Sequence, residues 1–111
     1  GTAHGFYKKE PNLDFELLAK IANKTAATLV LHGGSGVPAY QLKQAISCGI
    51  CKVNLATEIK NVFMKSLKKQ LENNNEIDLR KIFPKATFEI TNLISDKLKI
   101  VRNENTEVFG C

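Results

Sequence analysis

Hydrophobic positions form two short continuous runs, flanked by longer stretches in which they recur every three or four residues. The runs cover residues 28–32 and 50–55, and such runs bounded by turn residues are typical of strands buried on both faces of a sheet. The helical spacing covers about 13–24, 38–49, 57–72 and 78–98. Because helices and strands alternate, the pattern predicts an α/β fold with a parallel sheet.

Residues with strong positional preferences stand at the borders of the predicted helices. Asn12 is expected to cap the first helix, and Pro38 to occupy the first position of the second. Gly49 is expected to end that second helix. Thr57 and Asp78 are expected to cap the third and fourth helices.

The last helical stretch contains a proline and follows an asparagine triplet that ends the third helix. Pro84 has no backbone N–H, so it must kink the fourth helix or mark its true start. The apolar stripe of that helix is predicted to comprise Leu79, Ile82, Phe83, Ala86, Ile90, Leu93 and Leu98.

Two parallel strands make too small a sheet to be covered by four helices, and both strands would have unpaired edges. The chain also begins at Gly1, without a methionine. We therefore expect it to be incomplete, a part of a larger α/β barrel or sheet.

Composition narrows the class of protein without defining its function. The net charge of +5 comes from scattered lysines, and only 7% of residues are aromatic, which argues against a nucleic-acid partner. No apolar run approaches the ~20 residues that a membrane span requires.

Three cysteines without a secretory signal indicate a reducing cytoplasm. Cys48 and Cys51 have no second pair for a zinc knuckle, so they are interpreted as two small buried side chains.

Chemistry-bearing residues follow both predicted strands. His32 comes directly after the first strand, and the glycine-rich turn 33–36 leads into the next helix. Unhindered backbone N–H groups beside a helix start favour an anion. His4 lies between Ala3 and Gly5 in an expected loop; taken alone, it is interpreted as a surface histidine.

At this point three segments show a resemblance to a known family: GTAHG, LVLHGGSG and KVNLATE. They resemble the class II, metal-dependent ketose-bisphosphate aldolases, in particular the fructose/tagatose-bisphosphate branch. The spacing also agrees, with 28 positions between the two histidines and 22 more to Asn54. The resemblance implies a TIM (β/α)₈ barrel, in which residues 1–111 are the C-terminal segment of a single domain, with its last two strands and flanking helices.

The resemblance also implies roles for individual residues. His4 and His32 would be two of three zinc ligands. The phosphate and neighbouring oxygens of dihydroxyacetone phosphate would be bound by Gly5, Gly33, Gly34, Ser35, Asn54, Leu55, Ala56 and Thr57. The family often binds a monovalent cation near this phosphate. The third histidine and the proton-transferring residues would lie upstream, so this segment holds no catalytic acid or base.

The implied activity is zinc-dependent cleavage, or the reverse condensation, of fructose or tagatose 1,6-bisphosphate to dihydroxyacetone phosphate and glyceraldehyde 3-phosphate. Such a lyase would act in carbohydrate metabolism such as glycolysis, as a cytoplasmic homo-oligomer without nucleic-acid or membrane partners. The residues present face the half that both sugars share, so they do not choose between them. Asp14 and Glu58 are interpreted as helix-start residues and do not replace the missing ones. Because only two of three zinc ligands are present, the isolated chain is predicted to bind zinc weakly and to lack activity.

Two other hypotheses remain open at this stage. One is a non-catalytic phosphate-binding α/β module that keeps the glycine turn and uses no metal. The other is a basic interaction domain for nucleic acid, whose binding would weaken steeply with salt.

Overall fold

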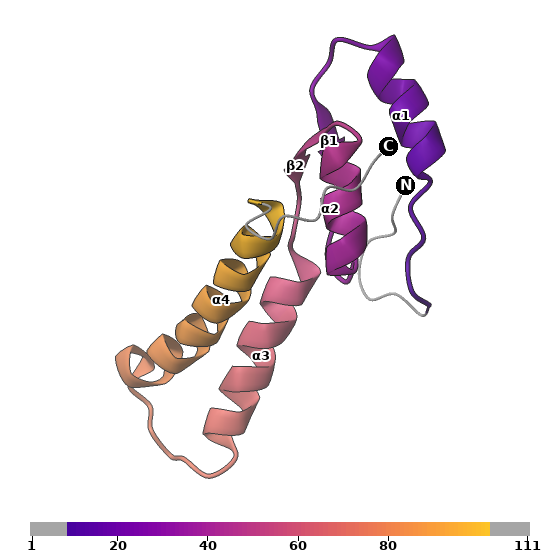
Figure 1. Ribbon diagram of the computed structural model, residues 1–111. Coiled ribbons are helices and arrows are strands. Elements are labelled where there is room, and N and C mark those ends of the chain that lie inside the picture. Colours follow the sequence, from indigo (N-terminus) through magenta and orange to yellow (C-terminus); the bar gives the residue numbers. More distant parts are fainter. Residues whose placement is uncertain (1–8, 103–111) are drawn as a thin grey trace.

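The computed structural model describes residues 9–102, which contain four helices and two strands in an α/β order (Figure 1). The elements are α1 (Phe15–Lys24), β1 (Leu29–Leu31), α2 (Ala39–Ser47), β2 (Ile50–Val53), α3 (Thr57–Leu71) and α4 (Leu79–Val101). The order and number of predicted elements are confirmed for this part of the chain.

The two strands pair in parallel, as predicted. Leu29 lies opposite Ile50, Val30 opposite Lys52 and Leu31 opposite Val53, with an irregularity between Leu29 and Val30. Since α2 connects parallel strands, the carboxyl ends of β1 and β2 lie at the same edge of the sheet, followed by the glycine turn and by residues 54–56.

The core lies between the sheet and α2, and the prediction that the strands are buried on both faces is wrong for this chain. Leu31, Leu42, Ala45 and Ile50 are buried together with Val37. In contrast, the side chain of Val30 is 45% exposed. A continuous apolar run is typical of a strand with helices on both faces of its sheet. Within residues 9–102, however, β1 is covered on one face only.

Helix starts differ from the predictions by one or two residues. Asp14 is the N-cap of α1, since its carboxylate accepts from Leu17 N–H at 2.9 Å. The predictions that Asn12 caps this helix and that Asp14 lies in its first turn are therefore wrong. Pro38 is the N-cap of α2 rather than its first residue. Thr57 is the first residue of α3, not its cap. The predicted stop at Gly49 is confirmed: the residue has φ 109° and its N–H donates to the Ile46 carbonyl.

Asp78 caps α4 as predicted, and Arg80 donates to it through both backbone and side chain. The Arg80 side chain, followed by its backbone N–H, lowers the pKa of the Asp78 carboxyl. Because the folded-state pKa is the lowered one, the resulting stabilisation is present above the ordinary pKa and lost as the pH falls through the lowered value.

The α3–α4 hairpin extends past the sheet and gives the molecule its long dimension of 57 Å (Figure 1). Pro84 lies inside a continuous α4, so it does not mark the start of this helix. Ile82 and Ala86 of the predicted stripe are buried, and Phe83 meets Phe63 edge to face at 5.7 Å. Three stripe members are substantially exposed: Leu79 57%, Phe83 39% and Leu98 45%.

The two cysteines of the C-x-x-C spacing have different environments. Cys48 at the end of α2 is buried, as predicted, but Cys51 on β2 is an exposed free thiol. Cys51 and the next residue, Lys52, are both exposed, and Cys51 falls at the irregularity of the ladder, between the paired residues Ile50 and Lys52. Within residues 9–102, no helix is both long and apolar enough to cross a bilayer.

Candidate functional site

The turns that follow β1 and β2 are joined by backbone hydrogen bonds. The Asn54 carbonyl accepts from Gly34 N–H at 2.9 Å, and the Leu31 carbonyl accepts from Asn54 N–H at 2.9 Å. The parallel ladder therefore continues past both strands, and it brings the predicted residues 33–35 and 54–57 together at the carboxyl edge of the sheet.

Gly34 is required at this junction for a steric reason. A Cβ atom there would lie 2.5 Å from Val53 Cγ1 and 3.2 Å from the Asn54 carbonyl oxygen. Gly33 and Gly36 have φ values of 74° and 78°, the left-handed region that glycine adopts without strain. The glycines of this turn thus satisfy steric and backbone demands, and the N–H group of Gly34 is used within the fold.

Ser35 connects the glycine turn to the start of α3. Its side chain is 8% exposed, and its hydroxyl accepts from Ala56 N–H at 3.2 Å and Glu58 N–H at 3.3 Å. The N-cap of α3, Ala56, has no capping side chain of its own. The serine therefore caps a helix that begins more than 20 residues further along the chain, and its hydroxyl hydrogen can still be donated to a ligand.

His32 directly follows β1, and Asn54 directly follows β2. His32 is exposed, and the Asn54 side-chain Nδ2 lies 3.0 Å from its Nδ1. In this orientation the amide donates and Nδ1 accepts, which corresponds to the tautomer with its proton on Nε2. A side-chain partner on one ring nitrogen orients an imidazole that binds a metal through the other.

Glu58, in the first turn of α3, is paired with a lysine from the far end of α4. Lys97 Nζ lies 3.0 Å from Glu58 Oε2, and the two side chains are 14% and 27% exposed. The Oε2 atom of Glu58 is buried. Its contact with Lys97 is an ion pair whose geometry does not meet the angular criteria of a hydrogen bond. Glu58 was correctly predicted at a helix start, but its pairing with Lys97 was not predicted.

The structure brings together the predicted residues of both turns, whereas His4 and Gly5 lie outside the described residues. Within residues 9–102, no cluster of three or more histidine, cysteine, aspartate or glutamate side chains could hold a metal ion. The described part of the chain thus offers a single imidazole for the predicted zinc, together with its orienting amide. The meeting of His4 with His32 stays a prediction.

Substituting the capping serine, Ser35→Ala, is expected to destabilise the junction between the two turns by about 1–2 kcal/mol, because two helix N–H groups lose their acceptor. The measurement is the free energy of unfolding of the complete protein in urea. Ser66→Ala on α3 is the control, since the Ser66 hydroxyl accepts from the Gln70 side chain within the same helix. Equal unfolding free energies for wild type and Ser35→Ala would contradict the capping role.

Comparison with known proteins defines the class to which this fold and site belong. Residues 1–106 match the family model described as "Fructose-bisphosphate aldolase class-II". The chain therefore belongs to the class II fructose-bisphosphate aldolase family, and the predicted resemblance is confirmed.

Two known proteins are similar to this one over most of its chain. A sulfofructosephosphate aldolase from Alkalicoccus urumqiensis is 37% identical over 106 residues, which is 95% of this chain and 37% of that protein. The crystal structure of the YdjI aldolase from Escherichia coli K12 superimposes with a TM-score of 0.77 at 30% identity, covering 91% of this chain and 37% of that chain. The chain thus spans a little over a third of the length of these relatives.

Proposed function

We propose that this chain is the C-terminal segment of a (β/α)₈-barrel aldolase and supplies the phosphate site and two of three zinc ligands. The complete enzyme would cleave a phosphorylated ketose to dihydroxyacetone phosphate and an aldehyde, as a homo-oligomer in the cytoplasm. The proposal rests on one observation: Gly34, Ser35 and Asn54 join the two turns by hydrogen bonds. These turns follow the carboxyl ends of two parallel strands, and barrel enzymes bind their substrates at that edge.

The phosphate site is supported by the N–H groups that converge at this edge. The first four N–H groups of an α-helix have no partner within the helix. Ser35 accepts from two of those at the start of α3, which leaves the N–H groups of Thr57 and Ile59 to donate to an anion. The N-terminal end of the helix dipole adds a favourable field for a phosphate.

The zinc site is supported by the chemistry and placement of His32. An imidazole is a preferred zinc ligand, and three protein ligands leave a catalytic zinc one open position. His4 would be a second ligand. The structure places the Asn54 amide nitrogen against His32 Nδ1. A metal bound through Nε2 would need the other orientation of this amide, with the Asn54 side-chain oxygen accepting from a protonated Nδ1. A bound zinc would polarise the ketone and stabilise the negative charge that develops on cleavage.

The substrate is the finer part of the proposal. Fructose and tagatose bisphosphates share the half that these residues would bind, and the name of the Alkalicoccus relative adds a sulfofructose phosphate as a third candidate. We keep a fructose- or tagatose-type bisphosphate as the proposed substrate. The alternative is a phosphate-binding module without metal, which the same two turns would serve equally well.

The test is an aldolase assay on the complete protein with fructose 1,6-bisphosphate, tagatose 1,6-bisphosphate and a sulfofructose phosphate in parallel. We expect release of triose phosphate that stops when zinc is chelated and returns when zinc is added. The isolated 111-residue chain is the control and is expected to release none, since it lacks a third ligand and the proton-transferring residues. Tight phosphate binding with no cleavage of any of these sugars would favour the module.

A further inference from the structure

The ion pair between Glu58 and Lys97 involves the first turn of α3, the helix whose start is part of the proposed phosphate site. Glu58 is the second residue of α3, and its own N–H donates to the same Ser35 hydroxyl that caps the helix. Its backbone is therefore part of the turn that would receive the phosphate, and its carboxylate contributes a negative charge to the same helix end. A carboxylate in the first turn stabilises a helix, but it repels a second anion at the same helix end.

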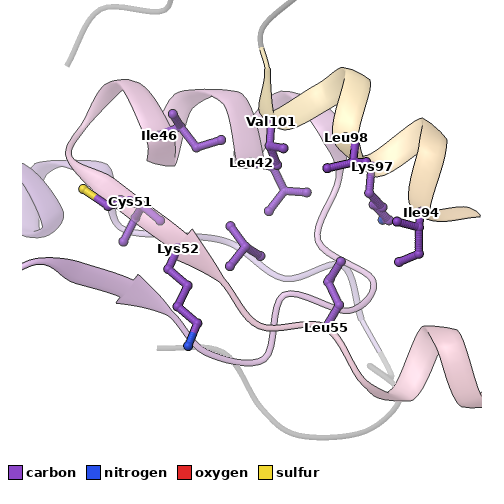
Figure 2. A pocket seen from close by; sticks show the side chains of 11 residues that line it. Leu42, Ile46, Cys51, Lys52, Leu55, Ile94, Lys97, Leu98 and Val101 are labelled. Atoms are coloured by element: carbon purple, nitrogen blue, oxygen red, sulfur yellow. The ribbon is translucent and has the colours of Figure 1, made fainter.

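Lys97 reaches this turn from a distant part of the chain. It lies on the same face of α4 as Ile94 and Leu98, beside a cavity of about 400 Å³ that also includes Leu55 of the β2–α3 turn (Figure 2). Its side chain is only 14% exposed, although a lysine ammonium is strongly hydrated when it is free. By comparison, the Lys99–Asp96 pair within α4 is a surface pair with exposures of 66% and 72%.

Stability alone is a weak explanation for this pair. Removing two charges from water costs free energy, and well-packed apolar side chains of similar volume often serve a fold as well as a buried ion pair does. The cavity around Lys97 is lined mostly by such apolar side chains, among them Leu42, Ile94 and Val101. What a lysine provides at this position, and an apolar residue would not, is a positive charge that compensates the Glu58 carboxylate.

We propose that Lys97 is a positioning residue of the phosphate site, which neutralises Glu58 so that the start of α3 remains attractive to a phosphate. Lys97 acts through the carboxylate and does not contact the ligand. Phosphate affinity then depends on the packing of α4 against α3, elements that are separated by the whole hairpin loop. The inference rests on the proposed phosphate site, and it adds a residue that lies outside the two turns.

The test uses the complete protein and measures the inhibition constant of inorganic phosphate, the KM of the bisphosphate substrate and the metal content. In Lys97→Met the Glu58 carboxylate is left buried and unpaired, and phosphate binding is expected to weaken about tenfold. The double variant Glu58→Gln with Lys97→Met removes both charges and should return the constant to within about twofold of wild type. Metal content should not change, and Lys99→Met should behave as wild type.

Each outcome bears on the proposal in a defined way. Unchanged phosphate inhibition in Lys97→Met contradicts it, and so does a double variant as weak as Lys97→Met, which would mean that the lysine binds phosphate directly. If Lys97→Met does not fold, Glu58→Gln alone still decides: it leaves the lysine charge uncompensated and should tighten phosphate binding, and an unchanged or weaker constant would contradict the proposal. A wild-type protein that phosphate does not inhibit would instead refute the proposed phosphate site itself.

Discussion

Replacing His32 with alanine in the complete protein is expected to remove the bound metal and abolish aldol cleavage. Loss of a side chain that merely orients a ligand already costs roughly 10–100-fold in metal affinity or activity, and loss of the ligand itself should cost more. The measurements are metal content per subunit and kcat. Thermal unfolding should be compared between the metal-free proteins, because loss of a bound metal by itself lowers stability.

The orienting amide provides a graded comparison for this variant. Asn54→Ala removes the partner 3.0 Å from His32 Nδ1 and is expected to weaken metal binding by roughly 10–100-fold without eliminating it. A His32→Ala protein that retains one metal per subunit and full turnover would refute the ligand role. The phosphate-binding module would then become the better hypothesis.

Gly34→Ala is expected to have the largest effect on folding among single substitutions in the two turns. The added Cβ would lie 2.5 Å from Val53 Cγ1, and relief by a backbone shift would break the hydrogen bond from Gly34 N–H to the Asn54 carbonyl. Overpacking and loss of this bond together should cost about 2–4 kcal/mol of unfolding free energy. Urea denaturation of the complete protein measures it.

A double variant identifies the steric cause of this loss. Val53→Ala removes the nearest atom, so Gly34→Ala combined with Val53→Ala should be less destabilised than the sum of the two single variants. The rescue should be partial, because the Asn54 carbonyl oxygen still lies 3.2 Å from the new Cβ. A Gly34→Ala protein as stable as wild type would contradict the close approach of the two turns.

The features that the sequence predicts correctly are those encoded by neighbouring residues. Two apolar runs and four helical repeats were sufficient for the element order and the parallel pairing, and Gly49 and Asp78 were identified at the correct helix borders. The family resemblance rested on three short motifs and is confirmed over residues 1–106. Local chemistry and motif spacing therefore account for the class of protein.

The features that were not predicted depend on contacts between distant residues. Nothing near Ala56 in the sequence indicates that its helix is capped by Ser35, and the partner of Glu58 is a lysine 39 positions away. Both contacts depend on how α3 lies against the glycine turn and against α4. Val30 was misjudged for a related reason, since burial of a strand depends on which layers cover it.

The reciprocal bonds between the β1–α2 and β2–α3 turns have an evolutionary consequence. Gly34 meets the Asn54 carbonyl, Ser35 caps the second turn, and Asn54 reaches back to His32. Neither loop can drift in conformation alone, so substitutions in the two should be inherited jointly across relatives. An engineer who transplants this phosphate-binding element into another barrel would have to move both loops, with their strand ends, as a single graft.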